Sequence, residues 1–224
     1  MKGVWAVKAA RICLSMIIIL LLISFAGCGK KYYFSFKDNQ SLTDGEHAWL
    51  SYGDGTAVFY SNGVALNDKW IVCPFGFRGD LTIEITYDLN VTEAEQIRFY
   101  FLIASDAVYP SDSYHGGAVL AGNPAVQYAL IAEKHYSSSE IRGYWPGVVP
   151  GLDRDGENVL QLTKRGDRYR FKLNGKLLAD YVAGMYFPNW FYIQILGEIE
   201  DGTYDGALVV KEVSITYTGD MQEI

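Results

Sequence analysis

The stretch Leu81–Leu89, with the sequence LTIEITYDL, alternates apolar and polar side chains without a break. Successive side chains of a β-strand point to opposite faces, so a period of two puts every apolar residue on one face and every polar residue on the other. A helix would need a period near 3.6, which this stretch does not show. The pattern therefore predicts a strand with one buried face and one face toward solvent.

The same criterion predicts strands along most of the chain, separated by turn sequences such as Asn174-Gly175, which supplies the positive φ angles of a tight hairpin. Helical turns are expected only near residues 92–96 and 177–183. Antiparallel strands with polar turns about every ten residues predict an all-β fold, a two-sheet antiparallel sandwich or jelly roll. Further strands are predicted at residues 32–36, 48–51, 57–60, 70–73, 96–104, 126–133, 159–164, 169–173, 191–196 and 207–217.

The N-terminus has the pattern of a secretory signal. Basic residues precede an apolar run, Ile12–Phe25, and the small pair Ala26-Gly27 stands directly before Cys28. The apolar run is about 14 residues, whereas a membrane-spanning helix needs roughly 20. A cleaved signal is therefore favoured over a membrane span.

The Ala26-Gly27-Cys28 sequence resembles the lipobox of bacterial lipoproteins. The resemblance implies that residues 1–27 are removed and that Cys28 carries a diacylglycerol, with an acyl chain such as palmitate on the new amino terminus. Residues 28–31 would then form a short linker to a domain at residues 32–224. It also implies a cell-envelope location, with the outer membrane favoured because Gly29 is not an aspartate. Two alternatives stay open: an ordinary cleaved signal, and an uncleaved anchor.

Charge and cysteine content exclude several roles for the domain. The formal net charge is −7, so nucleic acid and anionic lipid surfaces are poor partners for the body of the domain. With Cys13 in the signal and Cys28 at the lipid site, only Cys73 is left, and no internal disulfide is expected. Cys73 lies in the apolar run WIVCPF and is expected to be a buried, inert thiol.

The C-terminal part of the chain adds a second resemblance. NVLQLTKRGDRYRFKLNGKLL (Asn158–Leu178), followed by WFYIQIL and ALVVKEVSITY, resembles the second half of the concanavalin A-like lectin and glucanase superfamily, and GDLTIEITYDL resembles an earlier strand of it. The likeness covers about two thirds of the mature chain. It implies a concanavalin A-like sandwich, in which polar and aromatic residues of a concave sheet bind glycans.

Catalysis is a rival interpretation, as a glycoside hydrolase or lyase of the same fold. The nearest acidic pair on one strand face is Glu84 and Asp88, whose backbones would lie roughly 13 Å apart. Retaining chemistry needs two carboxyl groups about 5 Å apart. A solvated surface is favoured for this pair, and no catalytic residue is assigned. His47, His115 and His135 lack the spacing of metal ligands.

Two acidic segments have features of a calcium site. Asp153–Asn158 has part of a calcium-loop pattern, but a hairpin turn is the favoured interpretation. A second cluster would allow Ca²⁺, although a solvated loop is favoured there too. The residues of this second cluster are Glu198, Glu200, Asp201 and Asp205. No cofactor is therefore expected.

The candidate ligand site comes from strands whose polar and aromatic residues oppose an apolar face. Sugars stack their C–H faces on aromatic rings, while Arg and Gln side chains hydrogen-bond hydroxyls. Two long loops, residues 106–117 and 142–147, are expected to form its walls and contribute Tyr109, Tyr114 and further aromatic residues. The candidate ligand-binding residues are Arg98, Tyr100, Gln127, Arg142, Tyr144, Trp145, Trp190, Tyr192 and Gln194.

The sequence therefore predicts a lipid-anchored envelope protein that binds glycan or polysaccharide. A third interpretation is a structural or assembly lipoprotein that docks another protein through an aromatic face.

Overall fold

Strand β6 (Leu81–Leu89) shows the predicted alternation directly: Leu81, Ile83 and Ile85 are buried, while Glu84 is exposed. The computed structural model describes residues 29–38, 41–42, 48–91, 96–107, 112–122, 127–184, 190–200 and 206–224. The signal segment and Cys28 lie outside this part of the chain. Residues 31–224 form one compact unit. Among the described residues, no helix has the length and apolar character needed to cross a membrane.

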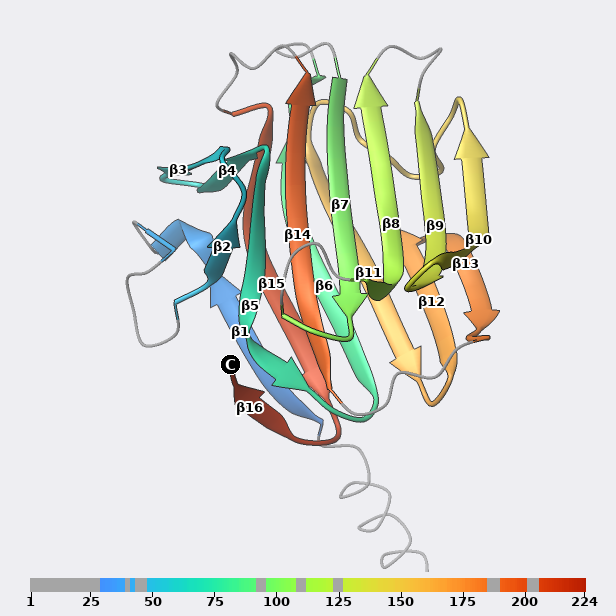
Figure 1. Ribbon diagram of the computed structural model, residues 1–224. Helices are drawn as coiled ribbons and strands as arrows, with labels where there is room; N and C mark the ends of the chain where they lie inside the picture. Colours follow the sequence, from blue (N-terminus) through green and yellow to red (C-terminus); the bar gives the residue numbers. More distant parts are fainter. Residues whose placement is uncertain are drawn as a thin grey trace, which may run out of the picture. The chain divides into compact units, whose positions relative to one another are not determined.

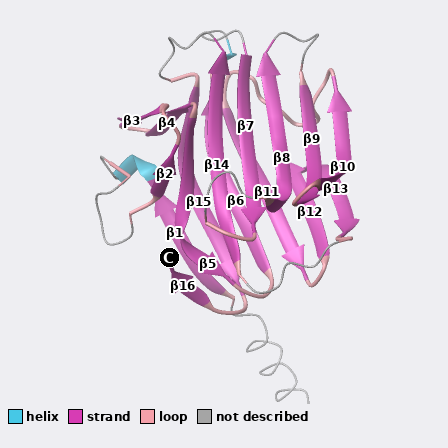
Figure 2. Cartoon of the chain, in the orientation of Figure 1, coloured by secondary structure: helices cyan, strands magenta, loops and turns pink. Residues whose placement is uncertain are grey.

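The described strands form two antiparallel sheets of eight strands each. The two sheets lie face to face (Figures 1 and 2). Sheet A runs in the order β13 (Lys176–Val182), β12 (Arg168–Leu173), β11 (Glu157–Arg165), β6, β15 (Leu208–Tyr217), β4 (Gly63–Asn67) and β3 (Thr56–Tyr60), and β1 (Lys30–Ser35) pairs with β15. Sheet B runs in the order β10 (Ser138–Pro146), β9 (Tyr128–His135), β8 (Ser113–Gly122), β7 (Gln96–Ala104), β14 (Phe191–Glu200), β5 (Lys69–Phe77) and β16 (Met221–Glu223), and β2 (Leu50–Tyr52) pairs with β5.

The core lies between the two sheets. Tyr87 of β6 stacks on Phe99 of β7 with ring centroids 4.2 Å apart, and Phe101 of β7 packs on Phe171 of β12 at 5.8 Å. These ring pairs join strands of different sheets, so alternate residues of each sheet meet in one hydrophobic cluster. The predicted all-β, two-sheet antiparallel sandwich is confirmed.

Some of the predicted element types are wrong. The expected loop at residues 106–117 is partly strand β8, and the expected loop at 142–147 is mostly the end of strand β10. Residues 177–183, expected to hold a helical turn, are mostly strand β13. Of the helical turn expected at 92–96, residues 92–95 lie outside the described residues. The one described three-residue helix, η1 (Phe36–Asp38), was not predicted.

Glycines explain why β8 does not have the appearance of a strand in the sequence. Gly116 and Gly117 lie where the backbones of neighbouring strands approach closely, and a Cβ atom would collide with the carbonyl oxygens of Phe101 and Leu130. Glycine in a strand interior often marks such a close approach. These two glycines therefore allow β8 to pair closely with β7 and β9, and they do not indicate a loop.

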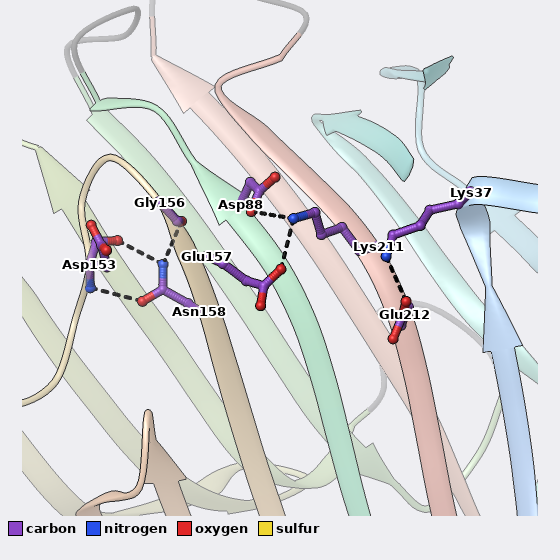
Figure 3. Close-up of polar contacts among 8 residues, drawn as sticks. All are labelled: Lys37, Asp88, Asp153, Gly156, Glu157, Asn158, Lys211 and Glu212. Carbon is purple, nitrogen blue, oxygen red and sulfur yellow. Dashed lines mark hydrogen bonds and ion pairs between the residues drawn. The ribbon is translucent and has the colours of Figure 1, made fainter. Parts of the chain in front are cut away.

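The outer face of sheet A carries ion pairs. Lys211 lies between Asp88 and Glu157, with its Nζ 2.8 Å from a carboxylate oxygen of each, and Lys37 pairs with Glu212 at 2.7 Å (Figure 3). An exposed pair such as Lys37–Glu212 contributes little to stability, whereas the Lys211 side chain is only 14% exposed. This face is therefore a charged, solvated surface, as expected for Asp88.

The Asp153–Asn158 segment is a turn held by the buried Asn158 side chain. Asn158 accepts a hydrogen bond from the Asp153 N–H at 2.9 Å and donates to the Asp153 and Gly156 carbonyls (Figure 3). The prediction of a turn is confirmed. It is not a hairpin, because it joins β10 of sheet B to β11 of sheet A.

Candidate functional site

One register row crosses sheet B on the face turned away from sheet A. On β7, Ile97, Phe99 and Phe101 belong to the core cluster, so Arg98, Tyr100 and Leu102 point to the outer face. Adjacent positions in the row are about 4.8 Å apart. From β2 to β10, the row consists of Tyr52, Trp70, Leu196, Tyr100, Ala118, Leu130 and Tyr144.

The middle of this row is a small apolar cluster separate from the core. Trp70, Leu102 and Leu196 are buried in it, and Tyr52 and Tyr100 pack against them while staying partly exposed. The rings of Trp70 and Tyr100 are 6.2 Å apart. Aromatic rings are thus fixed on a rigid, central part of the sheet and remain partly accessible from outside.

Polar groups lie beside these rings. Glu198 of β14 stands opposite Arg98 of β7. Its Oε2 accepts hydrogen bonds from Arg98 Nη1 at 3.3 Å and from the Tyr100 hydroxyl at 3.1 Å. The side chains of Arg98 and Glu198 are each 32% exposed, so both reach solvent. Burial, and then the nearby Glu198 carboxylate, raise the pKa of Tyr100 above its usual range, so its hydroxyl stays protonated.

Two further tyrosines extend the aromatic surface toward the edge of sheet B. Tyr128 of β9 lies in the same row as Arg98 and Glu198, separated from Arg98 by Leu120. Its ring is 6.2 Å from that of Tyr144 on β10, which is 55% exposed. We define the candidate site as Trp70, Arg98, Tyr100, Tyr128, Tyr144 and Glu198.

The structure does not bring all the predicted site residues to this surface. Arg98, Tyr100 and Tyr144 lie together on it. Tyr192 is on the same face, but its register partner is Ala104, six residues from Arg98 and therefore roughly 20 Å along the strand. Its ring lies against Gly76 of β5. Trp190 lies just before β14, two residues from Tyr192, and is half-buried. The predicted set is therefore divided between two ends of the sheet.

Arg142 was expected to reach ligand, but it points between the sheets. It occupies an irregular position in β10, where the register with β9 shifts between Ile141 and Gly143. A β-bulge of this kind redirects a side chain. The guanidinium binds the fully buried carboxylate of Glu133 and lies 5.2 Å from the centre of the Tyr181 ring. Arg142 therefore serves the interior rather than the outer face.

Trp145 is also turned toward the other sheet. It pairs with Ala129, a core residue, whereas its neighbour Tyr144 pairs with Leu130 on the outer face. Its Nε1 donates a hydrogen bond to the Leu178 carbonyl of β13 at 3.0 Å. This bond ties the edge of sheet B to the edge of sheet A.

The two predicted glutamines are buried. Gln127 precedes β9, is 7% exposed and donates to the Gly122 carbonyl at 3.0 Å. It is Tyr128, not Gln127, that faces outward. Gln194 does lie on the outer face, as expected, but it is fully buried and donates to the Asp106 carbonyl at 3.1 Å. Neither amide is accessible to a ligand in this arrangement.

Sequence reasoning missed Trp70 and Tyr128 as site residues and treated Glu198 only as a possible calcium ligand. Strand β9 has apolar residues on both faces, so its sequence does not show which of its residues point to the core and which point outward. Glu198 becomes recognisable only from its pairing with Arg98 across two strands that are 100 residues apart in the sequence.

The described acidic residues form no group able to hold a metal ion. Of the acidic cluster considered for calcium, Asp201 and Asp205, and the side chain of Glu200, lie outside the described residues, as do His47 and Tyr109. Glu84, considered for catalysis, accepts a hydrogen bond from Gln161 at 2.9 Å on the outer face of sheet A. It is thus on the opposite side of the molecule from the candidate site.

No family model matches the sequence, and no curated protein matches it. Solved structures match over most of the chain. A Bacillus subtilis protein of unknown function with a galectin-like fold matches with a TM-score of 0.58 at 12% identity, over 84% of this chain and 96% of that one.

Two carbohydrate-binding proteins match similarly. The carbohydrate recognition domain of Emp47p gives a TM-score of 0.56 at 12% identity, over 83% of this chain and 95% of that one. The carbohydrate-binding module CBM66 of Bacillus subtilis gives 0.53 at 15% identity, over 80% and 97%. At these identities the likeness establishes the fold alone. The chain has the concanavalin A-like, galectin-like sandwich fold, which lectins and carbohydrate-binding modules share.

Proposed function

We propose that this protein binds a glycan or polysaccharide through the candidate site on the outer face of sheet B. The observation that carries the proposal is the register of sheet B. It sets the partly exposed Tyr100 beside the Arg98–Glu198 pair and puts Tyr128 and Tyr144 on the same face, two and three strands away from Arg98. The fold, shared with lectins and carbohydrate-binding modules, supports the same conclusion.

The chemistry of the site suits a sugar. Aromatic rings offer flat apolar faces on which the C–H face of a pyranose stacks. The Arg98 guanidinium donates hydrogen bonds and the Glu198 carboxylate accepts them, and both are held in place by each other and by Tyr100. A sugar hydroxyl is both donor and acceptor, so it pairs with either group. Binding on these terms requires no reaction.

We also propose that the protein is tethered to the cell envelope by lipid on Cys28, with the outer membrane favoured where the organism has one. The basic head, apolar run and Ala26-Gly27-Cys28 sequence support this. Strand β1 begins at Lys30, two residues after Cys28, so the sandwich would stay close to the membrane surface. Two or three acyl chains would make this attachment stable.

A glycan array followed by titration of the best ligand tests the binding proposal. Tyr128→Ala and Tyr144→Ala should each weaken binding by about tenfold, because an aromatic contact contributes roughly 0.5–1.5 kcal/mol beyond the area that it buries, and 1.4 kcal/mol is a factor of ten. Tyr33→Ala is the matched control, since Tyr33 is 52% exposed on β1 of sheet A. Absence of binding to every saccharide would refute the proposal, as would equal loss in all three variants.

A further inference from the structure

The charge of Arg98 is already balanced inside the candidate site. Its Nη1 lies 3.3 Å from Glu198 Oε2, and the two residues are direct register partners on neighbouring strands. To bind an acidic ligand, Arg98 would have to give up its ion pair with Glu198 and form one with the ligand. The pair as it stands presents no net charge to whatever approaches the site.

Glu198 keeps one oxygen available. Its Oε2 is shared by Arg98 and Tyr100, while Oε1 accepts no hydrogen bond within the part of the chain that the structure describes. A carboxylate oxygen accepts hydrogen bonds and cannot donate them. A sugar hydroxyl therefore satisfies Oε1, whereas a uronate, sulfate or phosphate group on a ligand would meet a like charge.

A second cation on this face, Lys134, is far from the site. Lys134 of β9 points outward, with its Nζ 5.9 Å from the centre of the Tyr114 ring. Its register partner Tyr114 is six residues along β8 from Leu120, the partner of Arg98, which corresponds to roughly 20 Å. Arg142, which the sequence predicts to bind ligand, pairs with Glu133 between the sheets instead.

From this arrangement we infer that the site selects uncharged saccharides and that Glu198 is the residue that rejects acidic ones. The inference rests on the proposed function, because it assumes that the candidate site binds glycan. Glu198 acts in two ways: it accepts a hydroxyl of a neutral sugar, and its charge disfavours an anionic one. Selectivity of this kind comes from the repulsive contact as much as from the attractive one.

The test compares two sets of polysaccharides by affinity electrophoresis with the purified full chain at low salt, where electrostatic effects are largest. The neutral set is glucan, galactan, mannan and xylan, and the acidic set is polygalacturonate, alginate and hyaluronate. The unmodified protein should bind at least one neutral polymer about tenfold more tightly than any acidic one. Glu198→Gln should weaken neutral binding by about fivefold, because a hydrogen bond to a neutral amide is weaker than one to a charged group.

The same variant should gain binding to acidic polymers, because the negative charge of Glu198 beside Arg98 is removed, and this gain should fall with added salt. Glu84→Gln makes the identical change on the outer face of sheet A and should leave both preferences unaltered. Should Glu198→Gln fail to fold, Arg98→Gln replaces it: the bare carboxylate should then exclude acidic polymers even more strongly.

The outcomes separate the two ideas. Binding of acidic polymers in preference to neutral ones by the unmodified protein would overturn the inference and leave glycan binding intact. The same holds if Glu198→Gln leaves the preference unchanged. Failure to bind any polymer of either set would overturn the proposed function and, with it, this inference.

Discussion

The guanidinium of Arg142 holds the buried carboxylate of Glu133 with two hydrogen bonds, from Nε at 3.0 Å and from Nη2 at 2.7 Å. The backbone N–H of Gly184 donates to the same oxygen at 3.2 Å. The Glu133 side chain has no exposed surface, and that of Arg142 is 17% exposed. This ion pair therefore sits between the sheets, near the edge strands β10 and β13.

Removing one partner of this pair should be costly. Arg142→Met removes the counter-charge that Arg142 supplies to the buried Glu133 carboxylate, so the free energy of unfolding should fall by about 3–5 kcal/mol. The double variant Glu133→Gln with Arg142→Met should lose less than Arg142→Met alone, because no buried charge is left behind. Denaturant unfolding measures both. Equal losses in the two variants would contradict this role, and Arg170→Met, in an exposed ion pair with Asp180, should change little.

The stability of the sandwich should fall at mildly acidic pH because of His115. This side chain is fully buried, stacks on Tyr169 at 3.8 Å and shares a hydrogen bond with Tyr181 at 3.1 Å. Burial lowers the pKa of His115 to about 4, helped by the positive charges of Arg142 and Lys164 and opposed by Glu133. The unfolded chain takes up this proton near pH 6.5, well before the folded one does.

Between about pH 6.5 and pH 4 the unfolded state thus binds more protons, so the free energy of unfolding should decrease as pH falls, by on the order of 3 kcal/mol. His115→Phe has no titrating ring at this position. Unfolding titrations of both proteins at pH 7, 5.5 and 4.5 should show the unmodified protein losing stability relative to the variant. Parallel pH profiles would show that His115 does not titrate in this way.

Cys73 should be chemically inert in the folded protein. It is fully buried in β5, and burial raises the pKa of its thiol to about 12. Because only the thiolate is nucleophilic, alkylation by iodoacetamide at pH 8 should be negligible without denaturant and complete with it. Mass spectrometry of the peptide that contains Cys73 measures this. Rapid labelling of the native protein would be inconsistent with the packing of β5.

Cys28 should determine membrane attachment. Cys28→Ser removes the thiol that receives the lipid, so the protein should shift from the membrane fraction to the soluble fraction of the envelope. Incorporation of labelled palmitate into the unmodified protein, and not into the variant, is the accompanying readout. Retention of the variant in membranes would favour an uncleaved anchor instead.

The sequence was sufficient to predict the direction of side chains in strands with one uniformly apolar face. For β7 and β14 the alternation correctly assigned the outward direction of Arg98, Tyr100 and Gln194. It could not reveal that Gln194 is covered, since burial of an outer face depends on a segment, around Asp106, that is distant in the sequence.

Irregular backbone was the second obstacle. The close strand approach at Gly116 gave β8 the composition of a loop, and the irregular register at Arg142 reversed the direction of that side chain. Strand register was the third obstacle to prediction. The proximity of Glu198 to Arg98, and of Tyr128 to Tyr144, follows from strand order and alignment, which a single sequence does not contain.

Hydroxyl-radical footprinting of tyrosine side chains tests the central claim most directly. The protein is oxidised with and without a saturating concentration of its best glycan, and modification of each tyrosine is measured by mass spectrometry. Tyr128 and Tyr144 on sheet B should be protected by the glycan, while Tyr33 on β1 of sheet A should be modified equally in both samples. Protection of Tyr33 with full modification of Tyr128 and Tyr144 would contradict a ligand site on the outer face of sheet B.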